Sequence, residues 1–431
     1  MRGIDASDPR VGYDFGPSRS RTVPIFQTTT YGLQTVQRGN DLCALCESGY
    51  VYSRVTNPTV DVFEKRMAAL EGGIAATATS SGMSAITLTL AALAAPGGEV
   101  VSASQLYGGT YQSLKASLSR LSIHTTFIRS LCPDDFAVAI TEKTRAIYIE
   151  TIANSDGGVP DIEAFAKLAH EHGIPLVVDN TFGMGGYIVN PIALGADIVV
   201  HSATEWIGGH GTFLAGVVID SGNFDWRKSD KFPNINGPAS AYNDINMAEV
   251  FYPAGFTVHL RADLLRDLGP ALSPMNAFLA LQGLETLSLR AQRHCDNALG
   301  VAQFLEAHPY VNSVTYLGLP SHPCHELAKR IFRPNTFGGV ITFRVRGGVE
   351  KVVKIVEATK LASLLANVGD AKTLIIPPYG MVQGQISAEE KEAGGVYEDM
   401  IRVSVGIENV EDIIADLRGA LEVAYSGEGD S

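Results

Sequence analysis

Two short apolar runs decide the fold of this chain, "IPLVVDNT" at residues 174–181 and "ADIVVHSA" at residues 196–203. Each is rich in Val and Ile and ends in small or polar residues, as a strand buried on both faces does. Similar runs precede them, "EVVSAS" at 99–104 and "TRAIYIET" at 144–151, and "DIEAFAKLAHEHG" at 161–173 has helical spacing. Buried strands that alternate with helices predict an α/β fold with a mostly parallel sheet covered on both faces.

A second set of patterns indicates a smaller α+β part toward the C-terminus. "GGVITFRV" at 338–345 is typical of a strand, and "MIRVSVGIENVEDIIADLRGALEVA" at 400–424 of a strand followed by a helix. A chain of 431 residues is also longer than one ordinary core supports. We therefore expect an N-terminal arm at 1–60, a large domain at 61–260 and a smaller C-terminal domain at 261–431.

Two segments are expected to be loops. Residues 221–260 are rich in Gly, Pro and Asn and show no clear period, which favours a long loop on the surface or against a neighbouring subunit. Cys43 and Cys46 have metal-like spacing but lack a second Cys/His pair nearby. We interpret them as two small apolar residues of a loop, because five scattered cysteines make no disulfide framework.

Composition excludes several classes of function. The net charge of −13 leaves no dense Lys/Arg stripe for a nucleic acid. No apolar run approaches the ~20 residues that span a bilayer, and the first residues carry no apolar signal-peptide core. We therefore expect a cytoplasmic protein whose partners are small molecules and copies of itself, with no nucleic acid and no membrane.

The parts of a phosphate and ring site meet at the carboxyl ends of the predicted strands, where parallel sheets collect reactive groups. "TSSGMSA" at 79–85 opens a helix whose free N–H groups suit a phosphate. Ser202 and Thr204 add hydroxyl groups, Tyr107 offers a ring face, and Asp179 offers a carboxylate. Alone, Asp179 would be an ordinary helix N-cap or strand end. Together these groups are what a pyridoxal phosphate site needs: a phosphate cradle, a stacking ring and a partner for the pyridine nitrogen.

The chain resembles the Cys/Met metabolism (trans-sulfuration) family of pyridoxal phosphate enzymes, and within it the O-acetylhomoserine sulfhydrylase branch. The resemblance runs from "RTVPIFQTTTY" at 21–31 to "DIIADLRGAL" at 412–421. The motifs that carry it are "YVYSRVTNPT", "SSGMSA", "LYGGTY", "VVDNTF", "ADIVVHSATEWIGGHGT", "GLETLSLR", "NVGDAKTLI" and "IRVSVGIE". It implies the type I, aspartate-aminotransferase-like fold and a homotetramer of dimers, or a homodimer, with shared active sites.

The resemblance also implies a role for each matching residue. Gly82, Met83, Ser202 and Thr204 would hold the phosphate, and Tyr52 and Arg54 would reach it from the arm of the neighbouring subunit. Tyr107 would stack on the ring and is a catalytic candidate, Asp179 would pair with the ring nitrogen, and Asn154 would lie near the ring oxygen. Arg402 would clamp a substrate carboxylate.

One position departs from the family in a way that changes the chemistry. In "HSATEWIGGHGT" at 201–212, Glu205 stands where the family has the lysine that binds the cofactor covalently. A carboxylate has no nitrogen for that bond, and the part of the role it can inherit is proton transfer. We therefore expect Glu205 to be an acid/base catalyst beside non-covalent pyridoxal 5'-phosphate. Like charge from Asp179 and the phosphate should raise its pKa and weaken cofactor binding.

Two further departures concern the approach to the site. In "IIPPYGMVQGQIS" at 375–387, Tyr379, Met381 and Gln383 replace a family stretch rich in Ser and Thr with a His. The arm ahead of "RTVPIF" is also short and unlike the family's. These changes suggest an altered or abandoned substrate.

Three hypotheses follow. The first is a transferase or lyase of specialised (secondary) metabolism that acts by β- or γ-replacement or elimination on an O-activated amino acid such as O-acetylhomoserine. The second is a catalytically inactive relative that serves as a structural or regulatory subunit of an active paralogue. The third is that the glutamate was engineered, or is an error in the sequence, and that the natural protein is an ordinary sulfhydrylase-like enzyme with lysine at this position. The changes at 379–383 argue against the third, because a single introduced substitution would leave that stretch alone. We favour the first.

Overall fold

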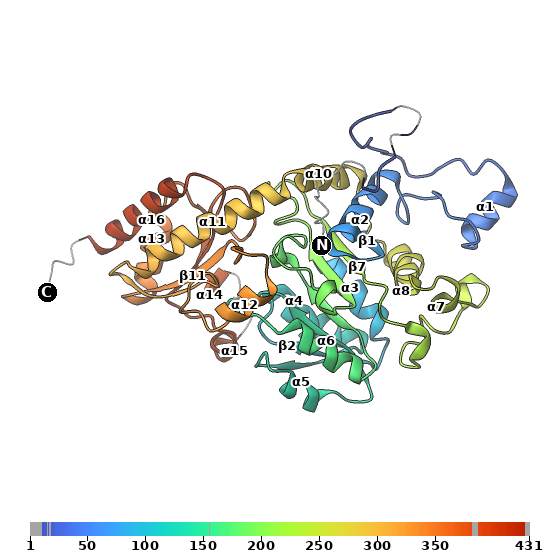
Figure 1. Ribbon diagram of the computed structural model, residues 1–431, viewed down its shortest axis with the longest axis horizontal. Helices are drawn as coiled ribbons and strands as arrows, with labels where there is room; N and C mark the ends of the chain where they lie inside the picture. Colours follow the sequence, from blue (N-terminus) through green and yellow to red (C-terminus); the bar gives the residue numbers. More distant parts are fainter. Residues whose placement is uncertain (1–10, 15, 17–18, 155, 382–386, 427–431) are drawn as a thin grey trace.

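The computed structural model describes residues 11–14, 16, 19–154, 156–381 and 387–426. Figure 1 shows two sheets with their helices side by side, the larger toward the right and the smaller, with α11, α13 and α16, toward the left. This arrangement confirms the predicted α/β class with a large, mostly parallel sheet and a smaller C-terminal α+β part. The three residue ranges predicted as arm and domains stay predictions.

The larger sheet has seven strands in the order β1–β7–β6–β5–β4–β2–β3. Its neighbouring strands run parallel except where β7 pairs with β1 and β6. The bounds are β1 Ala75–Thr79, β2 Glu99–Ala103, β3 His124–Ile128, β4 Thr144–Glu150, β5 Leu176–Asp179, β6 Ile198–Ser202 and β7 Gly216–Asp220. The four runs expected as strands are therefore strands, and the carboxyl ends of β2, β4, β5 and β6 meet at one edge of the sheet.

Capping residues mark the ends of helices in this part. The Asn57 side chain accepts from the Thr59 N–H at the start of α2 Pro58–Glu71, and Gly72 ends it with a φ of 74° that an L side chain rarely adopts. The Ser81 hydroxyl accepts from the Ser84 N–H at the start of α3 Gly82–Leu93. The others are α4 Gly108–Gln112, η1 Ser113–Ser117, η2 Ser119–Leu121, α5 Pro133–Ala139, α6 Ile162–Glu171, η3 Thr181–Gly183 and η4 Ile192–Leu194.

The smaller sheet has five strands in the order β10–β11–β14–β13–β12, antiparallel except for the pair β12–β13. Their bounds are β10 Val311–Thr315, β11 Val340–Val345, β12 Ser363–Leu364, β13 Leu374–Ile376 and β14 Met400–Ser404. Helices α11 Leu287–Glu306, α13 Gly348–Ala358 and α16 Val410–Tyr425 pack with it around a buried apolar cluster. The remaining helices are α1 Val36–Cys43, α9 Arg266–Leu268, α10 Pro274–Glu285, α12 His325–Ile331, α14 Pro378–Met381 and α15 Ala388–Ala393.

The two predicted loops contain more structure than expected. Residues 221–260 hold η5 Trp226–Lys228, β8 Pro238–Ala239, η6 Ser240–Tyr242, β9 Ile245–Asn246, α7 Met247–Val250 and α8 Gly255–His259, which runs into η7 Leu260–Leu265. Tyr242 and Met247 are buried there with Ala262. Elements of two to six residues are too short to show a period, which is why the sequence indicated none. Cys43 likewise ends a helix, and both Cys43 and Cys46 are exposed and unpaired.

Across the described residues, no helix is both long enough and apolar enough to cross a membrane.

Close backbone approach fixes the edge of the large sheet where α3 begins. Gly82, the first residue of α3, lies against the end of β6, and a Cβ at this position would come within 2.5 Å of the Ser202 Cβ. Gly216, the first residue of β7, lies against the Ser81 carbonyl, and a Cβ there would also come within 2.6 Å of the Thr79 hydroxyl oxygen. The two glycines therefore let the α3 N-terminus settle onto the ends of β6 and β7.

We predict that Gly216→Ala lowers the free energy of unfolding by about 1–3 kcal/mol, because a backbone carbonyl cannot give way as the tip of a side chain can. Gly419→Ala is the matched control, since a Cβ at this position of α16 meets nothing within 4 Å. That substitution should raise the unfolding free energy by up to about 1 kcal/mol. Urea unfolding of both variants measures the two changes, and equal effects of the same sign would contradict the packing described for Gly216.

Candidate active site

A cavity of about 330 Å³ opens at the carboxyl ends of the parallel strands. It is lined by Ser81, Gly82, Met83, Ile86, Tyr107, Thr110, Glu150, Ile152, Asn154, Asp179, Thr181, Phe182, Ser202, Thr204, Glu205, Leu214, Ala366, Asn367, Val368, Met381 and Arg402. The structure thus brings together every residue predicted for the site except Tyr52 and Arg54. Within the described residues, no group of three or more His, Cys, Asp and Glu is placed to hold a metal ion.

One end of the cavity is formed by the start of α3 and the turn after β6. The first backbone N–H groups of α3 lie beside Ser202, because Gly82 permits the close approach described above. The N–H groups of the first helical residues point along the helix axis and, with the positive end of the helix dipole, suit an anion. The Thr204 hydroxyl, which was predicted to face a phosphate, donates to the Ala215 carbonyl at 3.3 Å and accepts from its N–H at 3.1 Å. Thr204 therefore also ties the turn to the residue before β7.

Asp179 lies in the floor of the cavity and its carboxylate is held by three donors. One oxygen accepts from the Thr181 N–H at 3.0 Å and the Thr181 hydroxyl at 2.6 Å, and the other accepts from the Tyr148 hydroxyl at 3.1 Å. Burial, followed by the charge of Asp179, raises the pKa of Tyr148 well above its usual value, so the phenol stays a donor. This role of Tyr148 was not predicted, because a tyrosine within a buried apolar strand is typical of the core.

Tyr107 is positioned by Glu150. The Tyr107 backbone N–H donates to the Glu150 carboxyl at 2.6 Å, which fixes the start of α4. The Tyr107 side chain keeps 45% of its surface exposed, so a ring face is available over the cavity. Burial raises the pKa of Glu150 well above its usual value, and the charge of Asp179 adds to that shift.

Arg402 is a buried cation in the wall that β14 contributes. Its guanidinium donates to the Asn154 side-chain oxygen at 2.9 Å, and burial lowers its pKa to about 10. The guanidinium is therefore still charged at neutral pH. From the residues alone, an exposed strand charge would have been the expected position, and only the family resemblance indicated a site residue.

Glu205 lies in the turn after β6 and faces an environment that favours its neutral form. Burial raises its pKa to about 7, a hydrogen bond with Ser202 opposes the shift, and the charge of Asp179 adds to it. The predicted direction is therefore confirmed, although burial is a larger cause than like charge. Within the described residues, the Oε2 atom of Glu205 is buried without a hydrogen-bond partner.

The backbone of that turn is held from two other segments. The Arg290 guanidinium of α11 donates to the Trp206 carbonyl at 2.7 Å and the Ile207 carbonyl at 3.1 Å. Gly369, at a φ of 74°, packs so tightly that a Cβ there would lie 2.7 Å from the Trp206 nitrogen. Both residues belong to motifs that carried the family resemblance, "GLETLSLR" and "NVGDAKTLI", but no role had been assigned to either.

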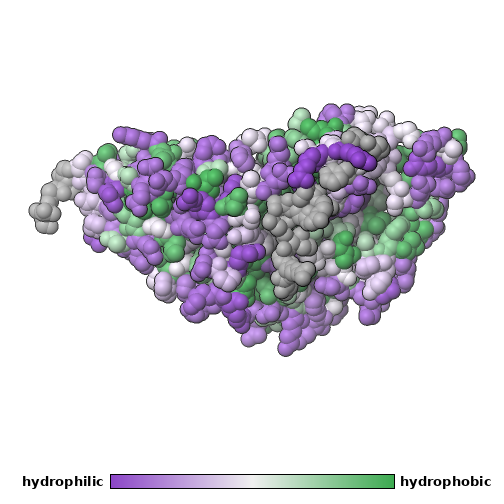
Figure 2. All heavy atoms as spheres, turned by 45° about the horizontal axis from the view of Figure 1, so that its top comes forward, coloured by the Kyte–Doolittle hydropathy of each residue, from purple (hydrophilic) through white to green (hydrophobic). Residues whose placement is uncertain are grey.

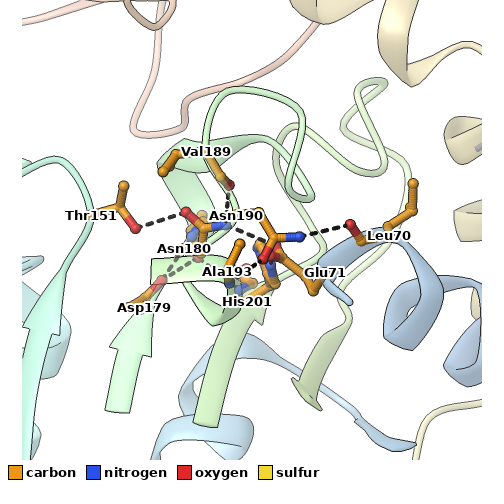
Figure 3. A network of polar contacts seen from close by, with 11 residues as sticks. Leu70, Glu71, Thr151, Asp179, Asn180, Val189, Asn190, Ala193 and His201 are labelled. Carbon is orange, nitrogen blue, oxygen red and sulfur yellow. Dashed lines mark hydrogen bonds and ion pairs between the residues drawn. The ribbon is translucent and has the colours of Figure 1, made fainter. Parts of the chain in front are cut away.

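A buried polar network lies behind the cavity (Figure 3). The His201 ring bonds to the Glu71 carboxyl at 2.6 Å, and the Asn180 amide donates to the same oxygen at 2.8 Å. Asn180 also accepts from the Thr151 hydroxyl at 2.7 Å. The end of α2 is thereby joined to the residues that directly precede Ser202 and follow Asp179.

Of the remaining predicted residues that the structure describes, Met381 lines the cavity and the others do not. Met381 lines the cavity, whereas the Tyr379 ring of α14 contacts the Lys391 ammonium at 4.2 Å. Gln383 lies outside the described residues. The Arg54 guanidinium sits 4.9 Å from the centre of the Tyr52 ring, and neither residue lines the cavity of its own subunit. A position outside their own cavity is what a role in the neighbouring subunit requires, and that role stays a prediction.

Known proteins match this chain over nearly its whole length. The model of the family described as "Cys/Met metabolism PLP-dependent enzyme" matches residues 11–422. Homocysteine synthase of Schizosaccharomyces pombe is 52% identical over 406 residues, which cover 94% of both chains. O-acetyl-L-homoserine sulfhydrylase 1 of Thermus thermophilus is 47% identical over 412 residues, 95% of this chain and 97% of that one.

A solved structure shares the fold. The putative O-acetylhomoserine (thiol)-lyase of Campylobacter jejuni superposes with a TM-score of 0.94 at 34% identity, over 97% of this chain and 100% of that chain. It contains N'-pyridoxyl-lysine-5'-monophosphate at position 205 of its own chain.

We predict that Glu205→Gln stabilises the protein at pH 8 but not at pH 5. A carboxyl whose pKa rises from 4.5 to about 7 on folding adds stability that is complete below the unfolded value and is lost as pH rises through the folded value. At about 1.4 kcal/mol per pKa unit, the advantage of the Gln variant over the wild type should grow by up to about 3 kcal/mol between pH 5 and pH 8. Urea unfolding at both pH values measures it. Glu422→Gln, at an exposed position of α16, is the control, and an equal pH dependence in both variants would contradict the shift at Glu205.

Proposed function

The chain belongs to the Cys/Met metabolism family of PLP-dependent enzymes, and from this premise we propose that it is a sulfhydrylase-like enzyme that performs β- or γ-replacement or elimination on an O-activated amino acid such as O-acetylhomoserine. The observation that carries the proposal is the single cavity lined by Asp179, Tyr107, Ser202 and the α3 N-terminus. The relatives named homocysteine synthase and O-acetyl-L-homoserine sulfhydrylase support the substrate class.

The residues of the cavity fit pyridoxal 5'-phosphate. The α3 N–H groups with Ser202 would hold its phosphate, the exposed face of Tyr107 would cover its ring, and Asp179 would pair with its nitrogen. The three donors on Asp179 hold its carboxyl group in place in the cavity and so suit that pairing. When bound, the cofactor supplies an aldehyde that accepts a primary amine and a ring that withdraws electrons.

The proposed binding of the cofactor is non-covalent. The Campylobacter jejuni protein holds its pyridoxyl group on a lysine. No lysine is among the described residues that line the cavity of this chain, and Glu205 has no nitrogen to form such a bond. Because its pKa lies near neutral, Glu205 can give or take a proton at physiological pH, which is the property of an efficient acid/base catalyst.

Arg402 is the residue we propose for the substrate carboxylate. Its guanidinium is charged, buried in the cavity wall and oriented by Asn154, and a planar fork of N–H donors matches a carboxylate. Met381 at the rim, with Tyr379 and Gln383 in the same stretch, supports a substrate that differs from the relatives' and hence a place in specialised metabolism.

Because no lysine is found among the described residues of the cavity lining, a second candidate function is also favoured, an inactive subunit that supports an active paralogue. The two candidates differ in whether the wild-type protein binds cofactor and forms product. We propose a cytoplasmic location, which was expected from the composition, for both candidate functions.

We propose a homotetramer of dimers in which the arm of one subunit completes the site of its neighbour. Tyr52 and Arg54 lie in this arm with α1, which extends away from both sheets (Figure 1). Figure 2 shows hydrophobic residues gathered at the end of the molecule where α7 and α8 lie. Val36 of α1 and Val250 of α7 are exposed. An apolar surface of this kind supports contact with another subunit.

We predict that Glu205→Lys binds the cofactor covalently, whereas the wild type binds it reversibly. After incubation with pyridoxal 5'-phosphate and reduction with borohydride, the peptide that contains residue 205 should gain the mass of the cofactor in the Lys variant alone, with Glu205→Gln as the uncharged control. The Lys variant should also hold the cofactor at least tenfold more tightly, which corresponds to about 1.4 kcal/mol.

Activity of the same proteins separates the hypotheses. Wild-type protein with added cofactor should form a replacement product from O-acetylhomoserine and sulfide. Wild type that binds no cofactor and forms no product would contradict the proposed enzyme and support the inactive subunit. A Lys variant with full sulfhydrylase activity beside an inert wild type would support lysine as the natural residue.

We predict that two inactive variants complement each other if sites are shared. Arg54→Ala should impair the neighbour's site and Asp179→Ala its own, so both should bind little cofactor alone. In a refolded equal mixture, a hybrid dimer has one intact site, and about a quarter of the wild-type binding capacity should return. Capacity is measured by equilibrium dialysis, and the absence of any recovery in correctly assembled hybrids would contradict shared sites.

A further inference from the structure

The three carboxyl groups that line the cavity differ in how fully their oxygens are used. Both oxygens of Asp179 accept hydrogen bonds, from Thr181 and Tyr148. Glu150 accepts from the Tyr107 N–H at 2.6 Å and also from the backbone of Asn154. Glu205, in contrast, has a buried Oε2 atom with no partner among the described residues. Among these three, Glu205 is therefore the carboxyl group that has an oxygen without any hydrogen-bond partner in the described part of the chain.

A buried acceptor of this kind is costly in the free protein, and a ligand that donates to it removes the cost. The partner that suits a carboxylate best is a cation with N–H donors, because a charge-assisted hydrogen bond is about twice as strong as a neutral one. The described residues offer no set of ligands for a metal ion. A primary ammonium group is compact and has three donors, enough for the Glu205 oxygen and the neighbouring Ser202 hydroxyl.

We propose that the free oxygen of Glu205 binds a primary ammonium group of the molecule in the cavity, so that the cavity selects an amine over its neutral isostere. The inference rests on the proposed function, because it assigns the ligand to the same pocket. Two sources carry this chemistry there. One is the aminomethyl group of pyridoxamine 5'-phosphate, the amine form of the cofactor, and the other is the α-ammonium of an amino-acid substrate.

Charged groups around Glu205 make this selection depend on pH in a defined direction. Asp179 on β5 and His201 on β6 act on the Glu205 carboxyl, and Glu150 on β4, Tyr107 before α4 and Arg402 on β14 line the same cavity. Because the pKa of Glu205 is about 7, the carboxylate that attracts an ammonium is mostly formed at pH 8 and mostly lost at pH 6. A primary ammonium with a pKa of about 10 keeps its charge throughout. The preference for the amine should therefore increase from pH 6 to pH 8.

The test compares ligands that differ in this one group and cannot react with the protein. Equilibrium dialysis would measure binding of pyridoxamine 5'-phosphate and of pyridoxine 5'-phosphate, in which a hydroxyl replaces the ammonium. We expect the amine to bind wild type at least tenfold more tightly at pH 8, and Glu205→Gln to reduce that ratio to about twofold or less. Titration of the shared phosphate cancels in the ratio.

A second experiment tests the other source, the α-ammonium of an amino-acid substrate. With saturating pyridoxine 5'-phosphate, wild type would be titrated with L-norleucine and with hexanoate, which lacks the amine. Selection of norleucine that disappears in Glu205→Gln would assign the ammonium to the substrate, and selection of pyridoxamine 5'-phosphate would assign it to the cofactor. Either result supports the inference.

Glu150→Gln is the matched control, because it removes a carboxyl group from the same cavity whose oxygens already have partners. The amine preference should survive in this variant. The inference is overturned if wild type shows no preference in either arm, or if the preference persists in Glu205→Gln.

The outcomes also separate this inference from the proposed function. If wild type binds the amine and the neutral ligand equally in both arms but forms product from O-acetylhomoserine, the inference is wrong and the proposed enzyme is supported. If the protein prefers the amine ligands but forms no product, the proposed enzyme activity is wrong and the inference is supported. Wild type that binds neither phosphorylated pyridine would overturn both.

Discussion

The turn after β6 depends on one buried cation, the Arg290 guanidinium. Besides the Trp206 and Ile207 carbonyls, it donates to the Gly283 carbonyl at 2.7 Å, so it joins the turn to the end of α10 as well as to α11. Burial lowers its pKa to about 10, which leaves it charged at neutral pH and able to donate to the Trp206 and Ile207 carbonyl oxygens of the turn. Thr204 and Glu205 line the cavity from this turn, and Ser202 lines it from the end of the strand that precedes the turn.

Local patterns were sufficient to predict the elements that carry the site. The apolar runs that became β4, β5 and β6 placed Glu150, Asp179 and Ser202 at strand ends, and parallel strands bring such ends together. What the sequence could not indicate was pairing between distant residues. His201 and Glu71 are 130 residues apart, and Arg290 and Trp206 are 84 apart. A hydrogen bond across such a separation leaves no period in the chain. Only the family resemblance predicted Arg402, for the same reason.

Burial and nearby charge both raise the pKa of Glu150 and of Glu205, but the hydrogen bonds that oppose the shift differ between the two. For Glu150, burial is followed by the charge of Asp179, and backbone N–H groups compensate in part. For Glu205, burial again dominates, but the compensating donor is a single side-chain hydroxyl on Ser202 together with its own backbone. Predicting its pKa from like charge gave the correct direction because Asp179 is near. The larger cause, burial, needed the fold.

The way the turn is anchored has an evolutionary consequence. Arg290 and Gly369 hold its backbone, so the side chain at residue 205 is not needed to keep the turn in place. A carboxyl group with an orphaned oxygen is in fact a burden on the folded state. Under selection for folding alone, mutation would drift toward a neutral side chain at this position. Retention of Glu205 in a lineage therefore requires selection for a property other than folding stability.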